Sequence, residues 1–169
     1  MKNILIISAT KKTNYTLAKK LSKFLLELNS STTVISLEDY MLPLYTDDVF
    51  DAKKNEYKDT IEILTKLFIN HAGIIICGPE YNGSTAPIIT NSIAWISCST
   101  DYWKDAFKNK IALIATASGG PGTKFVSAIK TQLEHLGCVV MPNSISANNS
   151  NPLNTDSVNK ILRHFIKSC

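Results

Sequence analysis

A chain of 169 residues, 44% hydrophobic and 19% charged, is long enough to bury a core and has the composition of a globular protein, which excludes a largely disordered chain. The net charge of +4 comes from lysines spread along the sequence, so no basic stripe for nucleic acid is indicated. We expect a single domain over residues 1–169 that has neither a nucleic-acid nor a membrane partner.

The cysteines and the N-terminus bear on the compartment. Cys77, Cys98, Cys138 and Cys169 show neither a CxxC pair nor a metal-ligand spacing, so we expect no metal site. Such cysteines are typical of reduced thiols, which predicts a cytoplasmic protein. The apolar run at the N-terminus ends at Ser8, which is too short for a signal peptide, and no later run is long enough to span a membrane.

Strand and helix patterns alternate along the chain. The first strand, at residues 3–7, leads directly into a helix at 13–29 whose apolar residues recur at helical spacing. The remaining strands are predicted at residues 32–37, 73–77, 111–116 and 138–140, and the remaining helices at 58–71, 87–97, 125–136 and 155–167.

Two long connections interrupt this alternation. Residues 38–57 and 142–154 have no regular period, so both are expected to be irregular. A connection as long as 38–57 acts as a lid or a subunit contact in some proteins, although a packed surface loop is the commoner case. The helix at 87–97 is more apolar than one buried face requires, which is consistent with a subunit interface.

Five strands that alternate with helices predict an α/β fold. Right-handed crossovers then give a three-layer, doubly wound parallel sheet, most simply flavodoxin-like with strand order 2-1-3-4-5. In this order the loops after strands one, three and four meet at the carboxyl edge of the sheet, where open α/β sheets bind ligands.

The loop after the third strand has the composition of a binding loop. Pro79 stiffens the backbone, while Glu80, Tyr81, Asn82 and Ser84 supply polar groups and one aromatic face. This mixture suits a planar heteroaromatic ligand with donors and acceptors on its edge. The plainer interpretation is a polar turn that caps the next helix, and the two interpretations are compatible.

The loop after the first strand suits a phosphate. Ser8, Lys11, Thr13 and Asn14 bring hydroxyls, an amide and a cation to the start of a helix, where free N–H groups and the helix dipole favour an anion. Neither the GxxxxGK[ST] nor the GxGxxG pattern is present. Taken alone, the loop is explained equally well by Thr13 as a simple helix cap beside solvated lysines.

The loop after the fourth strand is rich in glycine. Ser118, Gly119 and Gly120 allow a backbone to approach a ligand closely, although a tight strand-to-helix link has the same composition. The coincidence of the three loops is stronger than any of them alone. A phosphorylated flat ring fits them, and FMN is the obvious candidate.

The motifs in these loops resemble the NADPH-dependent FMN reductase family of the flavodoxin-like superfamily, which includes azo-dye, quinone and chromate reductases. The Pro-Glu-Tyr-Asn-x-Ser run at 79–84 is similar to the family's most specific signature, and Asn91 and Trp95 match the residues that follow it. Residues 118–120 resemble the second ring-binding loop. The first loop resembles the phosphate loop, with Lys11 or Lys12 in place of the usual arginine.

The resemblance implies an enzyme with FMN as cofactor and NADPH or NADH as co-substrate, which passes electrons to a soluble small-molecule acceptor such as a quinone, an azo compound or free flavin. It also implies a homodimer or higher homo-oligomer. The implied cofactor-binding residues are Ser8, Lys11, Thr13, Asn14, Pro79, Glu80, Tyr81, Asn82, Ser84, Ser118, Gly119 and Gly120.

No catalytic side chain is expected, because the flavin itself performs the redox chemistry. Glu80 is interpreted as a residue that shapes its loop. The alternative is a flavodoxin-like electron carrier, or a flavin-free interaction module, without NAD(P)H oxidase activity of its own.

Overall fold

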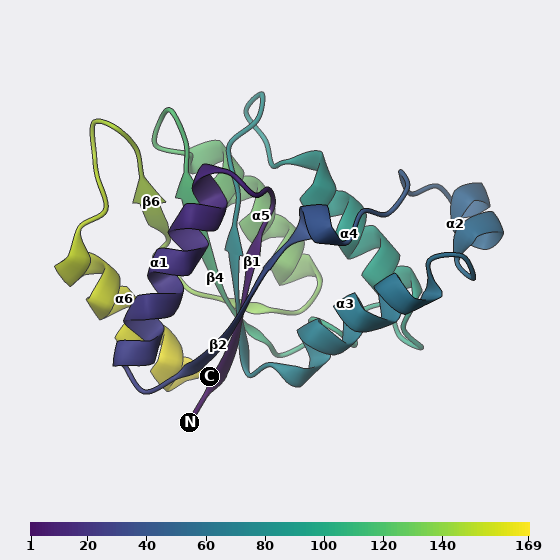
Figure 1. The fold of residues 1–169 in the computed structure, drawn as a ribbon, viewed down its shortest axis with the longest axis horizontal. Coiled ribbons are helices and arrows are strands. Elements are labelled where there is room, and N and C mark those ends of the chain that lie inside the picture. The colour runs from purple at the N-terminus through teal and green to yellow at the C-terminus, as the bar shows by residue number, and fades with distance from the viewer.

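The apolar runs of the sequence pair in parallel and form the central sheet of the computed structural model, which describes residues 1–169 (Figure 1). The strands are β1 (Asn3–Ser8), β2 (Ser31–Ser36), β3 (Gly73–Cys77), β4 (Ile111–Ala117), β5 (Val139–Val140) and β6 (Ile145–Ala147). The order β2-β1-β3-β4-β5 confirms the predicted one. In the middle of the sheet, Ile6 lies opposite Val34 on β2 and Ile75 on β3.

The fifth position of the sheet is filled by two short strands. Both β5 and β6 pair with β4, through Ile111 with Val139 and Ala115 with Ile145. The prediction that residues 142–154 are a loop is therefore wrong over 145–147. Three residues in an Asn- and Ser-rich segment carry no period of their own, and pairing with β4 alone makes them a strand. As a result, the chain after β6 returns to the carboxyl edge of the sheet.

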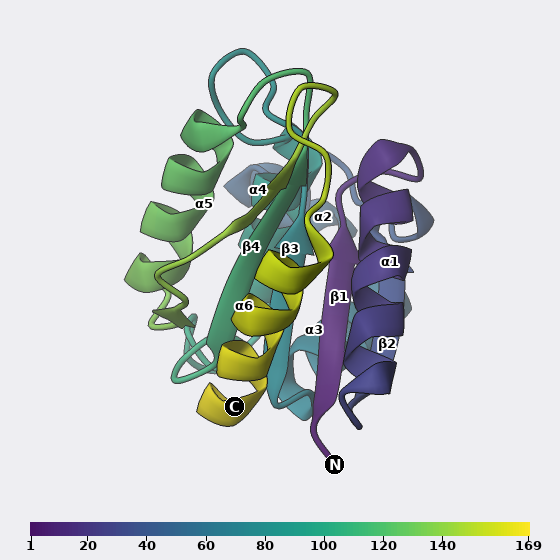
Figure 2. The same ribbon diagram turned by 90° about the vertical axis from the view of Figure 1, so that its left-hand side faces the viewer.

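Helices cover both faces of the sheet. They are α1 (Thr13–Glu27), α2 (Asp47–Lys53), α3 (Lys58–Asn70), α4 (Pro87–Cys98), α5 (Thr123–His135) and α6 (Thr155–Ser168). The face toward the viewer in Figure 2 carries α1 and α6, whereas α3, α4 and α5 pack on the opposite face.

Alternation along each strand divides the core between these faces. On β1, Ile4 and Ile6 join a cluster of 15 buried residues with α1 and α6, whereas Leu5 and Ile7 join a cluster of 25 with α3, α4 and α5. All four side chains are at most 1% exposed. Each such aliphatic side chain contributes about 1.5–3 kcal/mol by its burial, so these layers hold the strand ends and their loops in place.

The segment between β2 and α3 is more regular than its sequence suggests. It forms a short 3-10 helix, η1 (Leu37–Asp39), and then α2, so the prediction of an irregular 38–57 is wrong over 47–53. The Thr46 hydroxyl caps α2 by accepting the Val49 N–H at 3.2 Å, and Asp47 and Asp48 lie in the first turn. Because α2 buries no residue, it lacks the apolar period by which helices are found.

Two side chains of α4 anchor this segment to the rest of the protein. The Asn91 amide accepts the Tyr45 N–H at 2.8 Å and donates to the Leu42 and Pro43 carbonyls at 3.2 and 3.1 Å. The Trp95 indole N–H also donates to the Pro43 carbonyl, at 2.8 Å. Asn91 and Trp95, which follow the signature motif in the sequence, thus hold residues 42–45 against α4.

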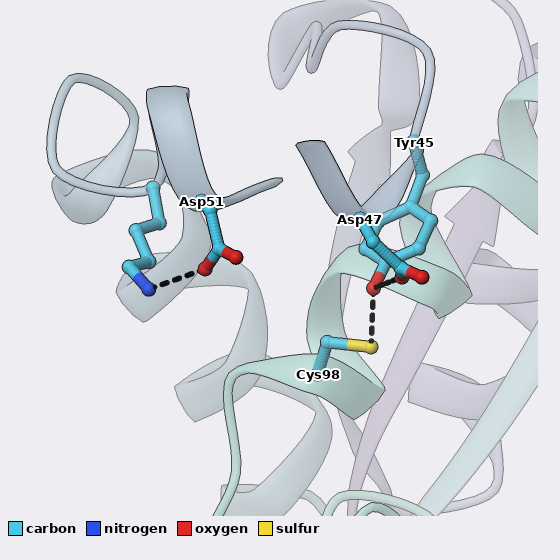
Figure 3. Close-up of polar contacts among 5 residues, drawn as sticks. Tyr45, Asp47, Asp51 and Cys98 are labelled. Atoms are coloured by element: carbon cyan, nitrogen blue, oxygen red, sulfur yellow. Dashed lines mark hydrogen bonds and ion pairs between the residues drawn. The ribbon is translucent and has the colours of Figure 1, made fainter. Parts of the chain in front are cut away.

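A polar contact at the far end of α4 completes this docking (Figure 3). The Tyr45 hydroxyl lies 3.0 Å from the Cys98 sulfur and donates to the Asp47 carboxylate at 3.2 Å. The hydrogen bond with Cys98, together with burial, raises the pKa of Tyr45 above its ordinary value. One turn along α2, Lys54 donates to Asp51 at 2.7 Å.

None of the helices combines the length and apolar character that crossing a bilayer requires. The four cysteines are free thiols, of which Cys77 and Cys138 are buried and Cys98 is exposed.

Candidate functional site

Four loops meet at the carboxyl edge of the sheet, at the top of Figure 1. They follow β1, β3, β4 and β6, and together with α1 they enclose a cavity of about 590 Å³. Its lining comprises Thr10, Lys12, Thr13, Asn14, Thr16, Leu17, Lys20, Pro79, Glu80, Tyr81, Ala117, Ser118, Gly119, Ala147, Asn148, Asn149, Pro152 and Leu153. The three loops that the sequence singles out therefore converge on one cavity.

The N-terminus of α1 is open toward this cavity. No side chain caps it, and the N–H groups of Lys12, Thr13 and Asn14 find no acceptor in the protein. Lys12 and Lys20 line the same cavity and take part in no ion pair. Free helix N–H groups beside unpaired cations are what a phosphate requires.

Lys11 lies outside the cavity. Its ammonium group pairs with Asp39, which raises the pKa of Lys11, and its N–H donates to Glu38 at 2.6 Å. Both acids belong to η1, which follows β2, the strand beside β1. Because β2 lies beside β1, Glu38 and Asp39 reach Lys11 and hold it away from the cavity. Lys12 and Lys20 are therefore the lysines that line the cavity.

Ser8 and Asn14 use their polar groups within the protein. Ser8 is fully buried and donates to the Thr10 carbonyl at 2.7 Å. The Asn14 side chain is also buried, and its amide donates to the Ala117 carbonyl and accepts the Ala117 N–H, both at 2.9 Å. Asn14 therefore ties the start of α1 to the end of β4.

The loop at 78–84 ends in a tight turn. Tyr81 and Ser84 exchange two backbone hydrogen bonds, of 3.0 and 2.9 Å, around Asn82 and Gly83. These two residues have φ of 50° and 73°, the left-handed conformation that an Asn-Gly pair adopts in such a turn. The Asn82 and Gly83 residue types are thus explained by the turn itself.

This turn separates the first cavity from a second one of about 660 Å³. Glu80 and Tyr81 line both cavities, and Tyr81 is 46% exposed. The second cavity is also lined by Asn82, Ser84, Thr85, Pro87 and Thr90, and no lysine or arginine lines it.

The loop between β4 and α5 leaves open space beside its backbone. A Cβ atom added at Gly119 or Gly120 would have no neighbour within 4 Å, and neither N–H group has an acceptor. Gly122 differs, because its φ is 69° and an added Cβ would lie 2.6 Å from the Thr116 methyl carbon. Packing therefore requires glycine at 122. At 119 and 120, by contrast, the backbone N–H groups are free and the space beside them is open, as a flat ring with acceptors on its edge requires.

Sequence reasoning missed the part of the cavity beyond this edge. Thr16 and Lys20 lie three and seven residues after Thr13, on the same helical face, a spacing that points to the cavity once Thr13 is placed there. The contributions of 147–153 depend on β6, and no local signal predicts that strand.

Residues 1–152 match the NADPH-dependent FMN reductase family. The chain belongs to this family. The proteins of this family are described as NADPH-dependent FMN reductases. The open N-terminus of α1 and the open glycine loop fit that cofactor.

Solved structures share the fold of this chain. FerB, a flavoenzyme NAD(P)H:(acceptor) oxidoreductase from Paracoccus denitrificans, superposes with a TM-score of 0.77 at 22% identity, over 99% of this chain and 96% of that one. An NADH:FMN oxidoreductase in its apo form gives 0.72 at 19% identity, over 99% and 90% of the two chains. An azoreductase from Bacillus anthracis gives 0.66 at 14% identity, over 99% and 96%.

Among curated proteins, an uncharacterized protein of Mycoplasma pneumoniae is 27% identical over 110 residues. The aligned part covers 63% of this chain and 64% of that protein, so the chain spans slightly less than two thirds of this relative's length.

Proposed function

We propose that residues 1–169 form a single domain that binds FMN in the cavity of about 590 Å³ and passes electrons from NADPH or NADH to a soluble small-molecule acceptor. The observation that carries this proposal is the pairing of an open helix N-terminus with an open glycine loop on one cavity. The first suits a phosphate and the second suits the edge of a flat ring.

At the phosphate end, the N–H groups at the start of α1 supply donors, and Lys12 and Lys20 supply positive charge. Lys11 is left out, because Asp39 already holds its ammonium group. Ser8 and Asn14 shape this end from beneath through their hydrogen bonds to the backbone.

At the ring end, the free N–H group of Gly119 offers a donor to the cavity, which Pro79 and Tyr81 also line. Gly120, whose N–H is also free, is the next residue along the loop. FMN, when bound, would supply the redox chemistry between the nucleotide and the acceptor. The chain itself positions the cofactor: rigid amides fix the orientation of the ring, and the loops exclude water from part of it.

The second cavity is where we place the nicotinamide ring of the nucleotide, with its phosphates outside the cavity, and, after it, the acceptor. It shares Glu80 and Tyr81 with the first cavity, so its occupant lies next to the ring. Because no cation lines it, acceptors without an anionic group, such as simple quinones, azo compounds or the ring of a free flavin, suit it best.

The proposal includes a homodimer in the cytoplasm. The segment that Asn91 holds on α4 exposes Leu44, at 76%, and Met41 just before it is 61% exposed. Apolar side chains with this exposure, next to the apolar helix α4, favour a subunit contact.

Steady-state turnover tests this function. With FMN present, the protein should oxidise NADPH or NADH only when a quinone, an azo dye or free flavin is supplied, and the rate should vanish when FMN is removed. A protein that holds FMN yet oxidises neither nucleotide with any of these acceptors would instead be an electron carrier.

A further inference from the structure

Glu80 connects the two loops that bound the ring end of the cavity. Its N–H donates to the Ser118 hydroxyl at 2.9 Å. Its carboxylate accepts the N–H groups of Lys124 at 3.0 Å and Phe125 at 3.4 Å. The loop after β3 is thus held at both ends of the loop after β4, through one residue.

The carboxylate of Glu80 is the only side-chain cap that α5 has. The residue at its N-cap is Gly122, which has no side chain, and no acidic residue lies in its first turn. An anion at the start of a helix binds the free N–H groups and opposes the positive end of the helix dipole. Glu80, which lies 44 residues earlier in the sequence than Lys124, fills that place.

Two of the helices that begin at this edge therefore differ at their N-termini. The N-terminus of α1 is open, whereas that of α5 is occupied by the Glu80 carboxylate. On the first cavity the open helix terminus is that of α1, so the phosphate of a ligand bound there lies at α1, which fixes the direction of the ligand along the cavity.

We propose that Glu80 is a positioning residue, which rests on the proposed binding of FMN in this cavity. It sets the spacing of the two ring-binding loops. It also covers the positive end of α5, so that the ring experiences less positive potential than an uncapped helix would impose. The last effect lowers the reduction potential of the bound cofactor, because positive potential favours the more negatively charged, reduced form.

The test compares Glu80→Ala, which removes the cap, with Glu80→Gln, which keeps an acceptor oxygen and removes the charge. Glu134→Ala is the matched control, because it removes a carboxylate from the other end of α5. For each protein, the dissociation constants of FMN and riboflavin, the midpoint potential of bound FMN and the melting temperature of the flavin-free protein are measured.

Glu80→Ala should weaken FMN and riboflavin by a similar factor of about ten, since the lost cap disturbs the loops and not the phosphate end. Glu80→Gln should recover most of this affinity but raise the midpoint potential. The control should match the wild type in affinity and potential.

A purely structural cap gives a different pattern. If Glu80→Ala and Glu80→Gln lower the melting temperature but leave both dissociation constants and the potential at wild-type values, the positioning role is refuted and the proposed function stands. If the wild-type protein does not bind FMN, the proposed function and the role of Glu80 are refuted together.

Discussion

Replacing Asn14 with alanine should loosen the connection between the first and fourth strand ends. The side chain is 3% exposed and makes two hydrogen bonds of 2.9 Å to the peptide groups of Ala117. Truncation leaves one donor and one acceptor of Ala117 without partners, and each such group costs about 1–3 kcal/mol. Because Ala117 borders the cavity, water reaches it in part, so we expect a total of about 2–4 kcal/mol.

Urea unfolding of the flavin-free protein measures this loss. Asn55→Ala serves as the control, because Asn55 is exposed and makes no hydrogen bond, and its effect should stay within about 0.5 kcal/mol. Asn14→Asp preserves the size of the side chain but turns a carboxylate oxygen toward the Ala117 carbonyl, so it should also destabilise. If both Asn14 variants lose less than about 0.5 kcal/mol, the two hydrogen bonds do not hold these loops together.

Three further predictions concern the cavity and the core. Gly119→Val should change the stability of the flavin-free protein by at most about 1 kcal/mol but weaken FMN binding. Gly122→Ala should lower the free energy of unfolding in urea by about 1–3 kcal/mol, because of the left-handed φ at 122 and the clash with the Thr116 methyl group. Equal losses of stability in the two variants would contradict this distinction. Lys12→Ala should weaken the binding of FMN by about tenfold in fluorescence titrations and leave the affinity for riboflavin unchanged. Lys11→Ala should change neither affinity. Burial raises the pKa of the Cys138 thiol from 9.0 to about 12. The unfolded chain therefore releases this proton at lower pH than the folded one, so the contribution of this thiol to the free energy of unfolding falls by about 1.4 kcal/mol per pH unit between its two pKa values. Cys138→Ser should show a shallower decline of stability with pH, and an unchanged slope would argue against the buried thiol.

The strand order and the edge at which the site lies follow from signals that are local in the sequence. Apolar runs such as 73–77 define buried strands, and the rule for crossovers then places the loops after β1, β3 and β4 together. The elements that sequence reasoning missed, α2 and β6, lack such signals. The first buries no residue, and the second is three residues long and is stabilised by its pairing with β4.

Within the site, the types of residue are easier to predict from the sequence than the contacts that each side chain makes. A lysine was expected near the phosphate, but the choice among Lys11, Lys12 and Lys20 depends on Asp39, which arrives from the neighbouring strand. The sequence predicts that Glu80 shapes its loop. In the structure its carboxylate does so by accepting hydrogen bonds from the N–H groups at the start of α5. Contacts between residues tens of positions apart decide such details, and periodicity does not report them.

The most direct test of the central claim is the visible spectrum of the purified protein with FMN, recorded under anaerobic conditions before and after NADPH or NADH is added. We expect a spectrum of protein-bound flavin that bleaches on addition of at least one of the two nucleotides. Bound flavin that neither nucleotide bleaches, or no bound flavin at all, would contradict the proposed function.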